Sequence, residues 1–531
     1  MPDIPASSVG VRNGRSVGAE LLAVCVFGAV VFLPGLWSRD LWHPLEPRYA
    51  QVAHEIVTRG DWVVLHLNGE PYYNKPPLLF WLAALSIKAL GRYTLAVRLP
   101  VLLFGVGCLI ACYLVALSLG VNPVLASLVL GTSMRFVWAA QRVTTDVILT
   151  FFVLMAFYLY LRSTQQAKRW WLYFGASSLA LGFALLTKGP VALLMLACAI
   201  VPYLVWQRNW KELLHWKWLA GLAIASLPVM AWLVPVVLLK GRCVIDIALW
   251  REVIARAGGY EARGAIHYYL RSLPGEFLPW VVYLPFALIY VCQRPGRSGA
   301  FRLVLWLAAA LLVFSLLPAK ADRYLIPLLP PAAITVAAYL DERDHWIGRV
   351  LLALLLAASV GLAVCAARRP AMLPWALGLA VPVGLASLAG WILWRRMGYR
   401  AVLGAAVIGL VAYPLTYGAD ADTRKSPVLL AGFLQSTGAP AARIIWVGGY
   451  EAGVAFHAGF AEMPCVDAIG SLDEYPASWL AVLGSVVQAS PEVYAGAEPV
   501  REFTIARATY YVYAPREGPE QCVGPGTCAY P

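Results

Sequence analysis

Charged residues and cysteines are scarce in this sequence, and both shortages narrow the class of protein. Only 13% of the 531 residues are charged, whereas 60% are hydrophobic. The ten cysteines are scattered, too few for a disulfide framework or a metal cluster, and several lie inside apolar runs where we expect them to pack. Cys522 and Cys528, close together in a polar segment, are the one pair that suggests a disulfide.

Several common catalytic motifs do not occur in this sequence in the structural setting that each of them requires. We find no Walker loop, G-x-G-x-x-G, H-E-x-x-H or G-x-S-x-G in the setting each requires. Nucleotide hydrolysis, zinc proteolysis and serine hydrolysis therefore lack support. The formal charge of +13 would suit nucleic acid, but the Lys and Arg residues lie in short loops between apolar runs. A membrane topology explains them better, and no nucleic-acid partner is expected.

Long apolar runs are what the sequence has in abundance, and its mean hydropathy is +0.68. Runs of about 20 residues span a bilayer as helices, because hydrocarbon offers no water to satisfy backbone groups. The runs lack the alternation of barrel strands. The sequence thus predicts an all-α polytopic membrane protein with about 13 transmembrane helices. The predicted spans are 17–37, 97–118, 122–140, 146–161, 170–187, 189–206, 217–239, 276–292, 301–318, 323–340, 347–366, 374–395 and 401–417.

Basic loops predict the orientation. The segments 162–169, 207–217, 293–302, 341–349 and 394–400 are rich in Lys and Arg, and alternation of the thirteen spans puts all of them on one side. By the positive-inside rule this side is the cytoplasm. The N-terminus is then cytoplasmic, with a retained first helix in place of a signal peptide.

The run 78–90 is an exception among the apolar segments. It is short of the ~20 residues needed to cross a bilayer, and it carries Lys88. Counting it as a span would reverse the side of every later loop. We therefore expect an interfacial or re-entrant helix inside a long external segment, 38–96, with a second external loop at 240–275.

The first external segment gathers ionisable side chains among aromatic residues. Glu46, Arg48, Glu55, Glu70 and Lys75 all lie between Asp40 and Gly91. A solvated connector is the alternative, but charge concentrated at a membrane surface is usually functional. The other external segments add Arg142, Asp146, Lys188, Glu252, Arg256, Arg263, His267, Lys320, Asp322 and Arg323. Bases that neutralise phosphate, beside carboxylates that handle a proton, suit a phosphate-bearing substrate.

The composition changes near Gly418. Long apolar runs give way to short strand-like segments at 443–449, 502–506 and 509–514. We expect a transmembrane domain over 1–417 and a small α/β periplasmic domain over 418–531.

An ordered set of motifs runs from about Leu41 to Pro331. It comprises PRYA, GDW, NGEPYYNKPPL, TTD, LLTKGP, PGEFLPW and KADRYLIPLLPP. This order resembles the GT-C class of membrane glycosyltransferases that use polyprenyl-phosphate sugars, in particular the aminoarabinose transferases, which are relatives of the protein O-mannosyltransferases. The resemblance implies a bacterial inner-membrane enzyme that moves a sugar from a polyprenyl-phosphate donor to a lipid, such as lipid A, or to a protein on the periplasmic face.

The same resemblance implies roles for individual residues. Asp146 matches the acid of the second external loop. The residues expected at the donor phosphate are Lys75, Arg48, Tyr49, Tyr72, Arg263, Arg323 and Tyr324. Lys188 and Glu252 are further candidates. The sequence itself offers plainer roles for two of these residues, because Asp146 could cap the following helix and Lys188 could snorkel to the interface.

Two departures from the family pattern affect the chemistry. The family's first motif has two adjacent acids, the first of them catalytic, whereas this sequence has Leu45 and Glu46. We expect Glu46 to act as the catalytic carboxylate, with Asp146 as the rival acid. The alternatives are that the enzyme works differently or that this copy is weakened. Ala262 stands where a histidine is expected and His267 is no clear replacement, so the sequence is compatible with a divalent metal without requiring any cofactor.

Two other functions remain open at this stage. A transporter or flippase of lipid-linked substrates should have related halves or broken helices facing each other, and no such pairing is evident. A noncatalytic protein that binds polyprenyl lipids is the second alternative, which Leu45 keeps open. Most of the 21 tryptophans are expected to be interfacial anchors, with Trp42 and Trp62 as the exceptions that could contact a sugar.

Overall fold

The computed structural model describes residues 14–42, 45–241, 264–295, 299–342, 346–369, 372–506 and 508–516. Glu252, Arg256, Ala262 and Arg263, like Cys522 and Cys528, lie outside these ranges.

Apolar helices coincide with every predicted span. Within the described ranges, nine helices are long and apolar enough to cross a membrane, or ten if the pair α6–α7, bent by 74°, is one span. The predicted spans 189–206, 276–292 and 301–318 coincide with shorter apolar helices. The polytopic α-helical class is confirmed, while the count of thirteen stays a prediction. The bounds are α1 Gly14–Phe32, α2 Pro34–Trp37, α5 Thr94–Ser118, α6 Pro123–Gly131, α7 Met134–Ala140, α8 Thr145–Gln165, α9 Trp170–Lys188, α10 Val191–Trp206, α12 Lys217–Lys240, α15 Leu284–Cys292, α16 Phe301–Leu316, α17 Leu329–Leu340, α18 Ile347–Ala367, α19 Leu373–Ile392 and α21 Tyr399–Tyr413.

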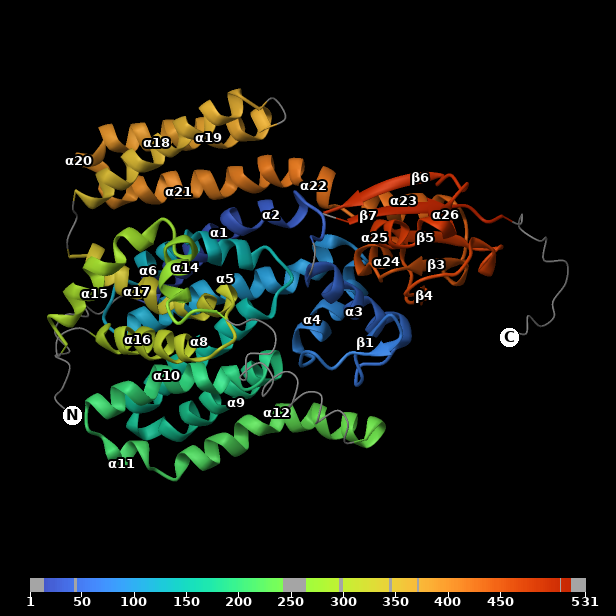
Figure 1. Cartoon of the computed structure of the whole chain (residues 1–531). Coiled ribbons are helices and arrows are strands. Elements are labelled where there is room, and N and C mark those ends of the chain that lie inside the picture. The colour runs from blue at the N-terminus through green and yellow to red at the C-terminus, as the bar shows by residue number, and fades with distance from the viewer. Residues whose placement is uncertain are drawn as a thin grey trace.

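The helices form a bundle with distinct ends (Figure 1). Helices α18, α19 and α21 lie on one side and α9, α10 and α12 on the other, with α5, α8, α16 and α17 between them. Outward-facing leucines such as Leu238, 81% exposed, and Leu385, 63% exposed, suit contact with lipid tails. The short helices of two basic loops, α11 (Trp210–Leu213) and α20 (Trp394–Met397), lie at the end opposite the C-terminal sheet.

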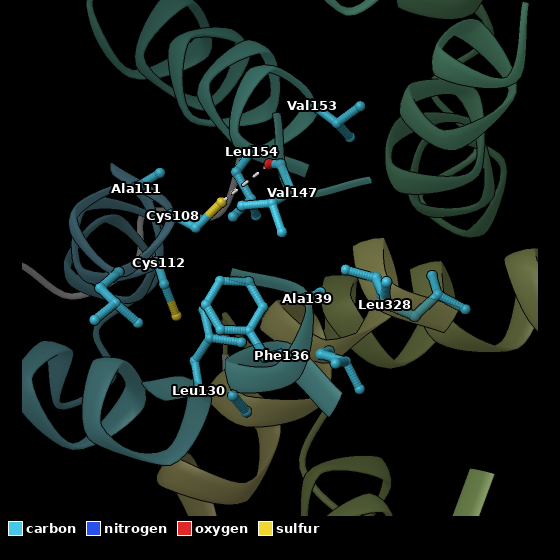
Figure 2. Packing of buried hydrophobic residues seen from close by; sticks show 14 of the residues in the cluster. Cys108, Ala111, Cys112, Leu130, Phe136, Ala139, Val147, Val153, Leu154 and Leu328 are labelled. Atoms are coloured by element: carbon cyan, nitrogen blue, oxygen red, sulfur yellow. Dashed lines mark hydrogen bonds between the residues drawn. The ribbon is translucent and has the colours of Figure 1, made fainter. Parts of the chain in front are cut away.

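The bundle core is closely packed around α5. Cys108 and Cys112 of α5 are fully buried, and they lie beside Leu154 of α8 and Phe136 of α7 (Figure 2). The Cys108 thiol donates a hydrogen bond to the Val147 carbonyl over 3.5 Å. These free thiols are the packing residues that the sequence predicts.

The first external segment folds into α3 (Leu45–Arg59), a hairpin of β1 (His66–Leu67) and β2 (Glu70–Pro71), and α4 (Leu78–Leu90). Helix α4 packs against α3 and α5. At 13 residues it is as short as the sequence predicts, and its interfacial or re-entrant position stays a prediction. Gly91, with φ of 91°, ends it in a conformation that favours glycine.

The C-terminal part contains a five-stranded sheet with the order β4–β3–β5–β7–β6. Strands β3, β4 and β5 are parallel, whereas β7 is antiparallel to both β5 and β6. The strand bounds are β3 Ile444–Val447, β4 Cys465–Val466, β5 Trp479–Leu483, β6 Arg501–Ile505 and β7 Ala508–Tyr513, and α23 (Val428–Ser436) and α24 (Ala452–Ala458) lie beside them. The small sheet is confirmed, and the boundary at Gly418 stays a prediction because helical structure continues through it to Lys425.

The sheet region docks on the first external segment. The Asn68 side-chain amide donates to the Met463 carbonyl (3.1 Å) and its carbonyl accepts from the Met463 amide (2.8 Å). Arg59 forms an ion pair with Glu462. Phe456 of α24 is fully buried within the core of the membrane bundle. One side chain of the C-terminal part therefore joins the core of the membrane bundle, while the sheet packs around two hydrophobic clusters of its own.

Candidate active site

A cavity of about 380 Å³, lined by charged and apolar side chains, lies where the α3 N-terminus, the α7–α8 turn, α14 (Tyr268–Glu276) and the 3-10 helix η4 (Asp322–Leu328) meet. Its lining residues come from segments that are far apart in the sequence. They are Leu45, Glu46, Arg135, Trp138, Ala139, Arg142, Val143, Thr144, Asp146, Tyr268, Ala321, Asp322, Arg323 and Ile326.

Glu46 forms the centre of a cluster of arginines. Its carboxylate accepts hydrogen bonds from Arg39 Nη1 (2.6 Å) and from Arg98 Nε and Nη2 (3.0 and 3.2 Å), and it lies 3.4 Å from Arg142 Nε. The backbone amides of Trp42 and Val143 also donate to it, over 3.3 and 3.1 Å. Three guanidinium groups thus share one carboxylate, which leaves positive charge in excess at the cavity wall.

The protonation state of Glu46 follows from these neighbours. Burial opposes ionisation, but Arg39, Arg98 and Arg142 outweigh it and hold the pKa of Glu46 well below its usual range. A carboxylate offers about four lone-pair directions, and the surrounding donors occupy them. The geometry makes Glu46 the anchor of the arginines, and the catalytic role predicted for it stays a prediction.

Trp42 and Trp138 lie against the guanidinium groups of Arg39 and Arg142. Arg39 lies 4.8 Å from the ring centre of Trp42, and Arg142 lies 4.6 Å from that of Trp138. Lys425 covers Trp42 at 4.3 Å, and only 2% of the Trp42 surface is exposed. Trp42 therefore supports the cations and is not an open platform for a sugar.

Asp146 lies at the start of α8, where Thr144 is the N-cap and its hydroxyl accepts from the Asp146 amide. The capping role suggested for Asp146 thus falls to its neighbour. One Asp146 oxygen accepts from the Thr144 hydroxyl over 2.7 Å, and the other pairs with the Lys188 ammonium. Lys188 also lies 5.2 Å from the ring centre of Tyr324. Lys188 is therefore drawn inward to Asp146 instead of snorkelling to the interface.

Among the residues expected at the donor phosphate, Arg323 lines the cavity and Tyr324 lies beneath Lys188. Tyr49 and Tyr72 pack edge-on against Phe80 in the core. Arg48 is exposed, and the Lys75 ammonium donates to the Asn74 carbonyl. None of these four lines the cavity, so their donor-binding role stays a prediction.

Trp62, the second tryptophan considered for sugar contact, is partly buried. Its carbonyl accepts a hydrogen bond from the Trp81 indole over 2.7 Å. That contact ties the loop after α3 to α4.

Several residues of the site were not predicted. Arg98 is fully buried near the start of an apolar span, where an arginine is itself a functional signal. Arg39 and Tyr268 carried no such signal. Within the described ranges no group of three or more His, Cys, Asp and Glu residues could hold a metal ion.

The family model described as dolichyl-phosphate-mannose-protein mannosyltransferase matches residues 19–292, just over half of the chain. The chain belongs to this family. The match confirms the resemblance that the motifs indicate. In this mannosyltransferase-family chain the matched range includes Glu46, Asp146 and Lys188 but ends before η4, so one wall of the cavity lies beyond it.

Curated relatives include the undecaprenyl phosphate-alpha-4-amino-4-deoxy-L-arabinose arabinosyl transferase of Erwinia tasmaniensis. It is 32% identical over 60% of this chain and 58% of its own length. Transferase 2 of Pseudomonas fluorescens, with the same description, is 31% identical over 61% of this chain and 59% of its own. The match thus spans about three fifths of these relatives.

Solved structures show a similar fold. ArnT from Cupriavidus metallidurans bound to undecaprenyl phosphate has a TM-score of 0.77 at 19% identity, and the apo form has 0.79 at 20%. Both comparisons cover 96% of this chain and 100% of the other. The multi-span fold with a small C-terminal sheet is therefore shared with ArnT.

Proposed function

We propose that the protein is a glycosyltransferase that moves a sugar from a polyprenyl-phosphate donor to a lipid A-like lipid or to a protein acceptor. The observation that carries the proposal is the cluster of Arg39, Arg98 and Arg142 around Glu46 at the wall of the cavity. The names of its curated relatives, which transfer aminoarabinose from undecaprenyl phosphate, support the same class of donor.

The excess positive charge suits the leaving group of this reaction. When the bond between the anomeric carbon and the phosphate oxygen breaks, the donor phosphodiester becomes a phosphate monoester with one more negative charge. Arg142 and Arg323, both lining the cavity, would stabilise that charge as it develops. A strong general acid is then unnecessary, and no cofactor takes part in our proposal.

The site residues are part of the proposal. Glu46 and Asp146 are the predicted catalytic carboxylates, and Arg323, Tyr324, Lys75, Arg48, Tyr49 and Tyr72 are the predicted contacts of the donor. We place the cavity on the periplasmic face of a bacterial inner membrane, because the basic loops lie at the other end of the bundle. Glu252 and Arg263 remain candidates outside the described residues.

The noncatalytic lipid-binding function is the second candidate, and one observation favours it. Leu45, which stands at the place of the family's first acid, lines the cavity beside Glu46. A protein that only binds polyprenyl lipids would keep the arginine cluster but would not catalyse sugar transfer.

The test uses the full chain purified in detergent, with undecaprenyl phosphate-linked aminoarabinose as donor and lipid A as acceptor. We expect a lipid A product heavier by one sugar in mass spectrometry, with release of undecaprenyl phosphate. Binding of undecaprenyl phosphate without transfer from any lipid-linked sugar would favour the binding protein. If the protein neither bound undecaprenyl phosphate nor transferred a sugar, both candidate functions would be contradicted.

A further inference from the structure

Three carboxylates line the cavity within the described residues, namely Glu46, Asp146 and Asp322. Attack by an acceptor hydroxyl or amine on a sugar requires a group that removes the acceptor's proton. A carboxylate can do so only if an oxygen is accessible and not already held by cations. The three differ sharply in this respect.

Glu46 is the least available of the three. Both of its oxygens accept from arginines, and two backbone amides add further hydrogen bonds. The residue is 1% exposed. Proton transfer to it would require an arginine to leave a buried ion pair, which is strongly unfavourable.

Asp146 is held on both sides as well. The Lys188 ammonium pairs with Oδ1 and the Thr144 hydroxyl donates to Oδ2. The residue is 3% exposed. A buried ammonium beside a carboxylate lowers the affinity of that carboxylate for a proton, so Asp146 is better suited to fixing Lys188 than to accepting a proton.

Asp322 differs from both. Its Oδ1 accepts a hydrogen bond from the Tyr268 hydroxyl over 2.7 Å. Among the described residues no other group donates to it, and no ion pair involves it within the same ranges. Its side chain is half-buried and lines the cavity, so part of this carboxylate remains accessible there.

The segment that carries Asp322 is firmly held. The Lys320 ammonium donates to the carbonyls of Phe314 (2.8 Å) and Ser315 (2.7 Å) at the end of α16. The Ala321 amide donates to the Tyr269 hydroxyl over 3.3 Å. Burial and the neighbouring Asp322 raise the pKa of Tyr268 to about 12, so its phenol stays protonated and keeps donating. Such positioning is what a proton acceptor needs.

We propose that Asp322 is the catalytic base of the transfer, which accepts the proton of the acceptor hydroxyl or amine on Oδ2 while Tyr268 holds Oδ1. The proposal rests on the glycosyltransferase function proposed above. The acceptor atom bonds to the anomeric carbon as the bond from that carbon to the phosphate oxygen breaks. The electron pair of the broken bond leaves with the polyprenyl phosphate, and the proton stays on Asp322 until solvent removes it.

The proposal also accounts for Leu45. This residue lines the same cavity from α3, and an aspartate on η4 supplies to that cavity the carboxylate that position 45 lacks. Asp322 lies outside the range that the family model matches. Asp322 thus takes the proton-accepting role that the sequence predicts for Glu46 or Asp146, and these two act instead as positioning residues for the arginines and for Lys188.

The test compares Asp322→Asn with Glu46→Gln, Asp146→Asn and Glu252→Gln in the full chain, using the same donor and lipid A. Asp322→Asn keeps the shape but cannot accept the proton. We expect kcat to fall about 10²- to 10⁴-fold, with unchanged binding of undecaprenyl phosphate and unchanged thermal stability. Asp322→Glu should recover part of the rate. Asp473→Asn, in an exposed 3-10 helix of the sheet region (Leu472–Glu474) where the carboxylate pairs with Arg516, is the matched control and should keep full activity.

Tyr268→Phe gives an independent readout. Because the Tyr268 hydroxyl holds Oδ1 of Asp322, its loss should lower kcat while the binding of undecaprenyl phosphate and the thermal stability stay unchanged. The proposal is overturned if Asp322→Asn transfers sugar at the wild-type rate, or if Glu252→Gln alone loses kcat. Should the wild type itself transfer no sugar, the proposed function fails and this proposal fails with it.

Discussion

At the scale of single residues, the Glu46 cluster shows why a buried charge is tolerated beside a membrane. Removing an unpaired carboxylate from water is strongly unfavourable, and three guanidinium groups with two backbone amides offset this penalty. Arg98 also donates to the carbonyls of Leu36 and Arg39, over 2.9 and 2.7 Å. Arg98, itself held by Glu46, therefore fixes the backbone at the end of α2 and just after it.

Glu46→Gln should destabilise the protein, because it leaves the charges of Arg39, Arg98 and Arg142 uncompensated. Breaking a buried ion pair typically costs ~3–5 kcal/mol of stability. Thermal unfolding in detergent measures the effect. Glu492→Gln, at an exposed position, is the control and should unfold like the wild type.

The same carboxylate predicts a dependence on pH. Because the folded state lowers the pKa of Glu46 below its ordinary value of 4.5, its contribution to stability is present above about that pH and is lost as the pH falls through the folded pKa. The wild type should therefore lose stability in acid more steeply than Glu46→Gln does. If the wild type and Glu46→Gln lost stability equally between about pH 6 and about pH 3, the lowered pKa assigned to Glu46 would be wrong.

Lys75 tests the resemblance itself. Lys75→Ala should weaken undecaprenyl phosphate binding by ~1.5–3 kcal/mol, the value of a hydrogen bond to a charged group. Lys168→Ala, on the basic loop at the other end of the bundle, should bind normally. Equal affinities in a direct binding assay on purified protein would remove Lys75 from the donor site.

At the scale of elements, the helices could be predicted because they follow from local sequence patterns. The cavity could not be predicted because it depends on contacts between residues far apart in the sequence. Hydropathy is a local property, so each apolar run became a helix. The run 122–140 is nevertheless divided at Thr132 and Ser133 into α6 and α7. The cavity depends on contacts such as Arg98 with Glu46, 52 residues apart, and Arg39 with the Gln141 carbonyl, 102 residues apart. No spacing rule foretells such pairs.

The hairpin β1–β2 offers a test of how the sheet region docks. Asn68, with φ of 53°, pairs with both backbone groups of Met463. Asn68→Gly keeps that backbone conformation accessible but removes two hydrogen bonds, each worth about 0.5–1.5 kcal/mol. Hydrogen exchange around residues 460–466 should become faster. Asn74→Gly, exposed in the same segment, should leave that exchange unchanged.

At the scale of the whole molecule, the two ends of the bundle differ in character. Short helices of two basic loops, α11 and α20, occupy one end, while α3, α4 and the sheet region lie at the other (Figure 1). A reporter fused after Gly418 should therefore be periplasmic, and one inserted within 207–216 should be cytoplasmic. If both reporters were found on the same side, the thirteen-span topology would be wrong.

The burial of Phe456 within the bundle core also has a consequence for biosynthesis. Chains emerge from the ribosome N-terminus first, so α3 is made long before α24 has been translated. Until then the face of α3 that α24 packs against lacks its cover. The core of the bundle is therefore complete only after α24 has been made, and a chain that stalls after α21 would expose that face to quality-control proteases.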